Sequence, residues 1–399
     1  MPLPLLQEVI RGSDKIADLT AANFPAQTRT LNIQRTGGPI SAIVITVQVT
    51  LAAALSTFLT WGLINILKKV TLKVKPRDKT LNRVELSGAS LFGLQWYEAG
   101  AGYVDASTKM AAYVSQINDA ESGATYRISY VINTAHPAMQ DDAFMTAIRS
   151  LIPCHVHAAD PTLVMEFAPA AEISGTANPF SAVGVDVQIL RADMPEEMSR
   201  QFTEKELWLD WELHENSFDL TPSLTNVPKR FELPTGGDHL SLLTYMHKGN
   251  ATLTLADIAA STAFGSETLW QLTAGKAAKD EWTNRHRQAW NQILSGASLA
   301  GMFDPTDAAY AQNNWGPMNP GGALTNGSVQ DAAVIFHDFF RATPHSGDLT
   351  RALTSRFGSP ATKFEIVGNV TTPANQNSAF VMAGRRYLSD IRGLKALAI

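Results

Sequence analysis

The feature that most restricts the fold is a series of short segments, rich in β-branched and aromatic residues, between residues 28 and 191. In the clearest of them, Ile43, Ile45, Val47 and Val49 recur at every second position, a period that favours a strand over a helix. Segments of this kind, each bounded by Gly, Pro, Asn or Asp, lie at 28–35, 41–50, 66–75, 81–87, 91–98, 125–134, 161–168 and 183–191. The first half of the chain is therefore predicted to consist mainly of β-strands.

The order of elements in this half recurs in the second. The first half contains a strand at 125–134, a turn at 134–137, a helix over Asp141–Ile152 and a strand at 161–168. The second half repeats this order with a strand at 332–341, a turn at 343–345, a helix at 347–357 and a strand at 361–368. Both halves then carry Ala-Asn-x-x-Ser-Ala, at 177–182 and 374–379, before a closing strand. The offset is close to half the chain, which indicates tandem copies of one fold.

The predicted fold class is mainly β, with two tandem eight-stranded jelly rolls, because eight strands make up one jelly roll. Four parts are expected: an N-terminal helical arm over 1–27, a first jelly roll over 28–194, an interdomain connection over 195–230 and a second jelly roll over 231–399. The second roll is expected to carry a long excursion over 255–330, with its clearest helix at Asp280–Leu294. The arm is expected to have no place in either sandwich and to dock on another surface.

Composition narrows the function. Only 17% of the residues are charged, which predicts a subunit with much of its surface buried against neighbours. The net charge of −5 argues against a general nucleic-acid binder. Charged residues interrupt the N-terminus, so we expect no secretion signal. Leu51–Leu67 has the length of a short membrane helix, but the alternation just before it favours strands over a membrane span.

One cluster carries the residue types of a metal or nucleophilic site: Cys154, His155 and His157, with Asp160 close behind. On an extended segment the two histidines share one face and Cys154 points to the other, so a structural role is favoured. The sequence contains no phosphate-binding glycine loop, no His-Glu-x-x-His helix and no Gly-x-Ser-x-Gly turn. We therefore predict no enzymatic activity and no catalytic, cofactor-binding or metal-binding residues.

A local basic stretch stands out from the acidic chain, with a charge of about +6 around the single carboxylate of Asp78. Its members are Lys68, Lys69, Lys73, Lys75, Arg77, Lys79 and Arg83. Two interpretations remain open: contact with phosphate groups of lipid or nucleic acid, or the solvated face of a half-buried strand.

The succession of elements resembles the double jelly-roll major capsid proteins of tailless icosahedral viruses, especially tectivirus-like phages with an internal membrane. The segments that carry the resemblance are Tyr126–Thr134, Asp141–Ile152, Leu163–Phe167, Val334–Phe340, Leu349–Phe357, Phe364–Val367 and Asn375–Asn377 with the strand Ala379–Leu388. The resemblance implies a homotrimer whose rolls form a pseudo-hexagonal block that tiles an icosahedral shell. It also implies a place in the virion, assembly in the host cytoplasm, and no catalytic residues.

The implied partners are other copies of the chain, penton and minor capsid proteins, and a viral membrane. The arm and Lys68, Lys69, Lys73 and Lys75 are the expected membrane contacts, and no specific nucleic acid is expected. The alternative is a jelly-roll carbohydrate-binding or carbohydrate-active protein, which would need acidic residues and exposed aromatic rings on one concave face.

Overall fold

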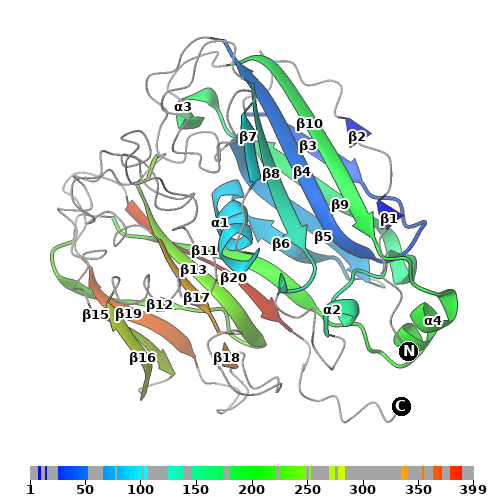
Figure 1. Ribbon diagram of the computed structural model, residues 1–399. Helices are drawn as coiled ribbons and strands as arrows, with labels where there is room; N and C mark the ends of the chain where they lie inside the picture. The colour runs from blue at the N-terminus through cyan, green and yellow to red at the C-terminus, as the bar shows by residue number, and fades with distance from the viewer. Residues whose placement is uncertain are drawn as a thin grey trace, which may run out of the picture.

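The computed structural model describes these parts of the 399-residue chain: 8–9, 14–15, 26–52, 66–76, 79–99, 103–106, 125–137, 146–173, 180–221, 224–248, 251–252, 269–274, 277–283, 334–339, 353–354, 363–370 and 378–388. They form three β-sheets and a few short helices (Figure 1). Strands β1 to β10 belong to the first half of the chain and β11 to β20 to the second.

A six-stranded sheet contains only first-half strands, in the order β1-β10-β4-β8-β7, with β2 also paired to β10. Its members are β1 (Glu8–Val9), β2 (Asp14–Lys15), β4 (Ile40–Leu51), β7 (Tyr103–Ala106), β8 (Thr125–Asn133) and β10 (Phe180–Arg191). The alternating residues of β4 have one buried face, since Ile43, Ile45, Val47 and Val49 are fully buried. The residues between and after them, Val44, Thr46, Gln48 and Thr50, remain half-buried. The alternation predicted from the sequence is thus the pattern of a sandwich strand.

A ten-stranded sheet joins the two halves, in the order β14-β13-β20-β11-β6-β5-β9-β3, with β17 and β18 paired to β13. Its first-half strands are β3 (Thr28–Asn32), β5 (Leu67–Pro76), β6 (Leu81–Leu86) and β9 (His157–Phe167). Its second-half strands are β11 (Trp211–Asp219), β13 (Asp238–Lys248), β14 (Ala251–Thr252), β17 (Val334–Asp338), β18 (Leu353–Thr354) and β20 (Ser378–Tyr387). The seam is a short parallel pairing of β6 with β11, where Leu213 lies opposite Val84.

A four-stranded sheet completes the second half, with the order β12-β19-β15-β16. Its members are β12 (Val227–Glu232), β19 (Phe364–Val370), β15 (Leu269–Ala274) and β16 (Ala277–Thr283). It packs on the ten-stranded sheet through aromatic rings, with Phe231 stacked on Phe380 at 4.0 Å and Trp270 at 5.9 Å from Phe380. Gly368 on the neighbouring strand β19 makes room for the Trp270 ring, since a Cβ there would lie 2.5 Å from that ring.

The two outer sheets cover opposite faces of the ten-stranded sheet. On β20, Phe380 faces the four-stranded sheet, whereas Arg385 faces the helix α1 (Gly88–Ala99). The two positions are an odd number of residues apart on a regular strand, so they point to opposite sides. Each half is thus a two-layer sandwich, and the two sandwiches share one continuous middle layer.

Helix α1 corrects the predicted strand at 91–98. Leu91, Phe92 and Leu94 are all buried, so the helix is apolar on more than one side and its sequence shows no clear period. The Ser87 hydroxyl accepts a bond of 3.1 Å from the amide of Ser90, which caps the first turn. Gly88 meets the Leu67 carbonyl, where a Cβ would lie 1.9 Å away, so the helix begins against β5.

Two further helix predictions are wrong in the described residues. Asp280–Thr283 is the end of strand β16, where Trp282 lies opposite Trp270 of β15, and pairing within the sheet outweighs the helical spacing. Within the predicted helix at 347–357, Leu353–Thr354 forms β18 and pairs with β13. Residues 284–294 and the remainder of 347–357 lie outside the described residues.

The helix predicted over Asp141–Ile152 is confirmed only as the short α2 (Thr146–Arg149), because Ile152 pairs with Ile40 and residues 141–145 lie outside the described part. The predicted connection over 195–230 contains α4 (Glu196–Glu204), all of β11 and the start of β12. The other short elements are α3 (Ala170–Ile173) and the 3₁₀ turn η4 (Cys154–Val156). The limits of the two jelly rolls remain a prediction.

The N-terminal arm also departs from expectation where it is described. Glu8–Val9 and Asp14–Lys15 are extended and pair with β10, at Leu190–Arg191 and Asp186–Val187. Without them the outer edge of β10 would leave backbone groups unpaired, and extended pairing satisfies those groups better than a helix would. The arm therefore has a place in the first sandwich.

Candidate functional site

The cysteine and histidine cluster at 154–160 is divided among separate contacts. Cys154 is buried in η4, where burial raises the pKa of its thiol, and Sγ lies 3.6 Å from the Ile152 carbonyl. The Nε2 atom of His155 is 3.0 Å from the Ser199 hydroxyl on α4. Asp160 pairs with Arg35 at 3.1 Å. A thiol with a raised pKa is a poor nucleophile at neutral pH, and its neighbours do not converge on it.

His157 at the start of β9 is the most perturbed member of that cluster. Burial, together with the nearby charge of Arg83, lowers the pKa of His157 to about 4, so the imidazole is neutral at pH 7. Among the described residues, no group of three or more His, Cys, Asp or Glu side chains is arranged to hold a metal ion. The described helices also include none that is long and apolar enough to cross a membrane.

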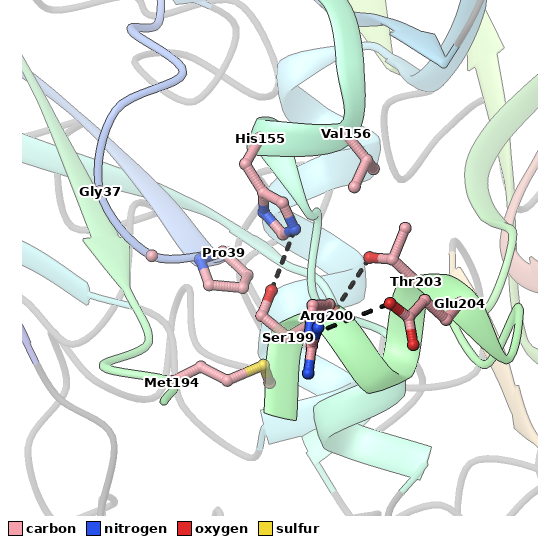
Figure 2. Close-up of a pocket in the computed structure, with 10 residues that line it drawn as sticks. Gly37, Pro39, His155, Val156, Met194, Ser199, Arg200, Thr203 and Glu204 are labelled. Atoms are coloured by element: carbon pink, nitrogen blue, oxygen red, sulfur yellow. Dashed lines mark hydrogen bonds and ion pairs between the residues drawn. The ribbon is translucent and has the colours of Figure 1, made fainter. Parts of the chain in front are cut away.

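A pocket of about 480 Å³ adjoins this cluster, between the turn at 37–39, η4 and α4 (Figure 2). Its apolar wall contains Pro39, Val156 and Met194. Its polar rim is provided mainly by α4, where Arg200 lies 3.9 Å from Glu204. The pocket therefore offers an apolar floor with charges at one edge, a combination suited to binding an amphipathic group.

The basic stretch is less concentrated than its sequence suggests. Lys69 donates a 2.8 Å bond to Glu85 on β6, and that bond raises the pKa of Lys69. Arg83 turns away from it and is buried, donating to the Trp211 carbonyl at 3.0 Å. Lys68 and Lys73 are exposed, and Arg77 lies outside the described residues. The described stretch thus offers two exposed lysines on β5 beside one neutralised pair.

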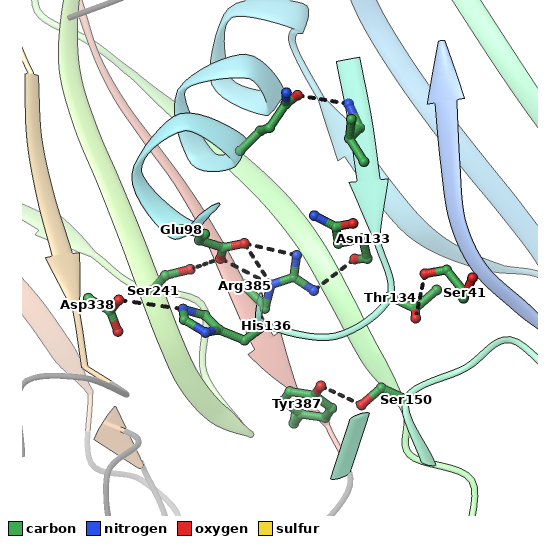
Figure 3. A network of polar contacts seen from close by, with 12 residues as sticks. Ser41, Glu98, Asn133, Thr134, His136, Ser150, Ser241, Asp338, Arg385 and Tyr387 are labelled. Atoms are coloured by element: carbon green, nitrogen blue, oxygen red, sulfur yellow. Dashed lines mark hydrogen bonds and ion pairs between the residues drawn. The ribbon is translucent and has the colours of Figure 1, made fainter. Parts of the chain in front are cut away.

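A buried polar cluster lies where the two halves meet, and we call it the junction cluster: Glu98, Arg385, Ser241, His136 and Asp338 (Figure 3). Arg385 of β20 donates to both carboxylate oxygens of Glu98 on α1, with Nε–Oε1 at 3.1 Å and an Nη–Oε2 distance of 3.0 Å. Both side chains are only 2% exposed. Ser241 of β13 also donates to Glu98, and His136 lies 3.6 Å from Asp338 of β17.

Charge balance explains how this cluster tolerates burial. Desolvation raises the pKa of Glu98, but the charges of Arg385 and His136 and the hydrogen bonds from Arg385 and Ser241 outweigh it, so the net pKa lies below the usual value. Arg385 also donates to the Asn133 carbonyl at 3.0 Å. The ionised pair thus links the end of β8 and α1 in the first half to β13 and β20 in the second.

Neutral contacts reinforce the same junction. The Ser90 hydroxyl of α1 lies 2.8 Å from the Tyr245 hydroxyl of β13, and Ser150 lies 2.5 Å from the Tyr387 hydroxyl of β20. Sequence reasoning missed this region because its members are far apart in the chain. The one local signal was Glu98, a lone carboxylate in an otherwise apolar segment.

Comparisons with known proteins identify the architecture. No protein-family model matches the sequence, and no curated protein matches it. The structure of the STIV (Sulfolobus Turreted Icosahedral Virus) major capsid protein is similar, with 13% sequence identity, 96% of each chain covered and a TM-score of 0.57. The PBCV-1 virus capsid is similar at 10% identity, covering 96% of this chain and 93% of that one, with a TM-score of 0.53. At such identities the similarity shows the fold, which confirms the predicted double jelly roll.

Proposed function

We propose that this chain is the major capsid protein of an icosahedral virus, forming pseudo-hexagonal homotrimers that tile the virion shell. The observation that carries the proposal is the similarity of fold to two viral capsid proteins along 96% of this chain and at least 93% of theirs. A match over nearly the whole length includes both sandwiches and their connection, so it supports the whole block as the functional unit.

The physical character of the chain supports a lattice subunit. A charged fraction of 17% leaves little obligatory solvated surface, as expected of a protein whose flanks contact neighbours. The shared ten-stranded sheet and the junction cluster link the two halves of the chain into one body. Three such bodies present six similar rolls around a threefold axis, the geometry that fills a hexagonal position in a lattice.

The proposal includes a place in the virion, assembly in the host cytoplasm, and contact with penton and minor capsid proteins. It also includes docking over an internal membrane through the N-terminal arm and Lys68, Lys69, Lys73 and Lys75. Lys68 and Lys73 are the exposed members of this set and are the best suited to meet anionic headgroups.

A role without catalysis follows from the same proposal. The residue types that first suggested chemistry have structural partners: His155 contacts Ser199, and Asp160 contacts Arg35. The carbohydrate-binding alternative requires exposed aromatic rings on one concave face. Among the described residues, the clustered rings Phe231, Trp270 and Phe380 are instead buried between two sheets.

Light scattering on the purified chain tests the proposed oligomer. We expect a particle of three times 43.2 kDa that persists at micromolar concentration. A stable monomer over that range would contradict the proposal. For the membrane contact, flotation with anionic vesicles should weaken in a variant with Lys68→Glu and Lys73→Glu, while binding unaffected by these changes would remove the lysines from the proposal.

A further inference from the structure

The pocket beside α4 is well formed and has no assigned role. Its volume of about 480 Å³ falls in the range of cavities that enclose a sizeable ligand. The wall residues Pro39, Val156 and Met194 come from three different segments, so the cavity is built by the tertiary fold (Figure 2). Covering the apolar wall of such a pocket with a further apolar group would be favourable, because it removes apolar surface from water.

The described part of the chain ends close to this pocket. The amide of Leu388, the last described residue, donates a 2.6 Å bond to the Asp210 carbonyl. Two residues before Asp210, the ring of Trp208 lies 6.4 Å from the ring of His155, which lines the pocket. Leu388 is 38% exposed, which makes it the one exposed large hydrophobic side chain among the described residues.

The segment that follows, residues 389–399, matches the pocket in length and character. Eleven extended residues span up to about 36 Å, more than enough to pass from Asp210 along the wall of η4. Apolar residues recur at every third position, at Ile391, Leu394 and Leu397, and the segment also contains Arg392 and Lys395. The rim of the pocket carries both signs of charge, because Arg200 and Glu204 on α4 both line it. The segment also carries both signs, with Asp390 beside its two cations, so each sign can meet its opposite at the rim.

We propose that residues 389–399 dock in this pocket of their own chain. The apolar side chains lie against Pro39, Val156 and Met194, and the cationic ones lie beside Glu204 at the rim. Docking covers the exposed Leu388 and ties the last strand of the second half to α4 and to the turn at 37–39 of the first half. The proposal is independent of the capsid function, since it concerns the contacts of a single chain.

Disulfide trapping tests the docking directly. We would combine Arg200→Cys, on the rim, with Leu394→Cys in the segment. Arg200 is 62% exposed, so its replacement costs little stability. The matched control combines Leu394→Cys with Glu281→Cys, at an exposed position on β16 on the other side of the molecule from α4 (Figure 1). A variant with Arg200→Cys alone checks that the buried Cys154 does not react.

Under mild oxidation we expect the Arg200→Cys pair to form a disulfide within one chain at least tenfold faster than the control pair. Equal rates would overturn the proposal. A disulfide between two chains would also overturn it, because the occupant would then come from another copy.

Methionine oxidation gives a second readout that needs no engineered cysteine. Met194 lines the pocket and is 8% exposed, whereas Met165 is fully buried in the first sandwich. Truncation after Leu388 should raise the rate of peroxide oxidation at Met194 several-fold and leave Met165 unchanged. An unchanged rate at Met194 would contradict the docking, and the slow rate at Met165 shows that the truncated chain remains folded.

Discussion

The buried pair of Arg385 and Glu98 allows a quantitative test of how the two halves are joined. Replacing Arg385 with Met removes three hydrogen bonds to Glu98, made by two nitrogen donors, and one to the Asn133 carbonyl. It leaves a carboxylate that is 2% exposed without its cation. Breaking a buried ion pair by removing one partner costs about 3–5 kcal/mol. We expect Arg385→Met to lower the free energy of unfolding by that amount at pH 7.

The pH dependence of this loss identifies its cause. Without Arg385, burial dominates and the folded-state pKa of Glu98 rises above its unfolded value. Stability from such a group is present below the unfolded pKa and falls as the pH rises through the folded pKa. The destabilisation by Arg385→Met should therefore shrink between pH 7 and pH 5, as Glu98 takes up a proton. The double variant Glu98→Gln with Arg385→Met should cost less than the sum of the two single changes.

Urea unfolding followed by tryptophan fluorescence measures these differences. All variants are compared at one protein concentration, because the proposed association of subunits would add to stability. The control is Lys363→Met, which removes an exposed ion pair with Glu232 of 3.0 Å and should cost no more than about 1 kcal/mol. A loss from Arg385→Met as small as that of the control, or one that is the same at pH 5 and pH 7, would refute the reasoning.

Three further predictions concern acid, the arm and the cysteine cluster. Burial lowers the pKa of His157 and of His239 to about 4, so the free energy of unfolding should decrease as the pH falls from about 6.5 towards 4. His239→Gln should make this decrease less steep. An unchanged slope of the free energy of unfolding against pH would exclude His239 as a cause of the acid sensitivity. Deletion of residues 1–22 should lower the melting temperature by only a few degrees, since only four described residues of the arm pair with β10. Loss of the folded state in circular dichroism would contradict this prediction and show that the arm is required for folding. Cys154→Ala should lower the free energy of unfolding by roughly 1–2 kcal/mol through lost packing, and His155→Ala should lower it by less. Neither change should alter the native mass. A bound metal ion that is lost with either change would show that these residues form a metal site.

The strands were predictable where one face of a segment is buried. Ile43 to Val49 show the alternation because β4 lies between an interior and a half-buried face. Helix α1 was mistaken for a strand because Leu91, Phe92 and Leu94 are buried on more than one side, and an element buried all round loses its period. Trp282 was placed in a helix because the pairing that fixes it, with Trp270, depends on the sheet and not on local spacing.

The candidate functional regions were less accessible to sequence reasoning. Glu98 and Arg385 are separated by most of the chain, and no local spacing brings them together. Arg83 was counted with the basic stretch because its neighbours are lysines, yet its position on β6 turns it towards Trp211 and Asp210. Contacts of this kind depend on tertiary structure, so only the three-dimensional structure of the chain reveals them.

Electron cryomicroscopy of the purified particle, viewed along its symmetry axis, tests the central claim most directly. The account predicts a threefold particle with a six-lobed, nearly hexagonal outline, because each of three chains contributes two sandwiches that share one ten-stranded sheet. A particle without threefold symmetry, or two sandwiches of one chain that take up variable relative positions, would contradict it.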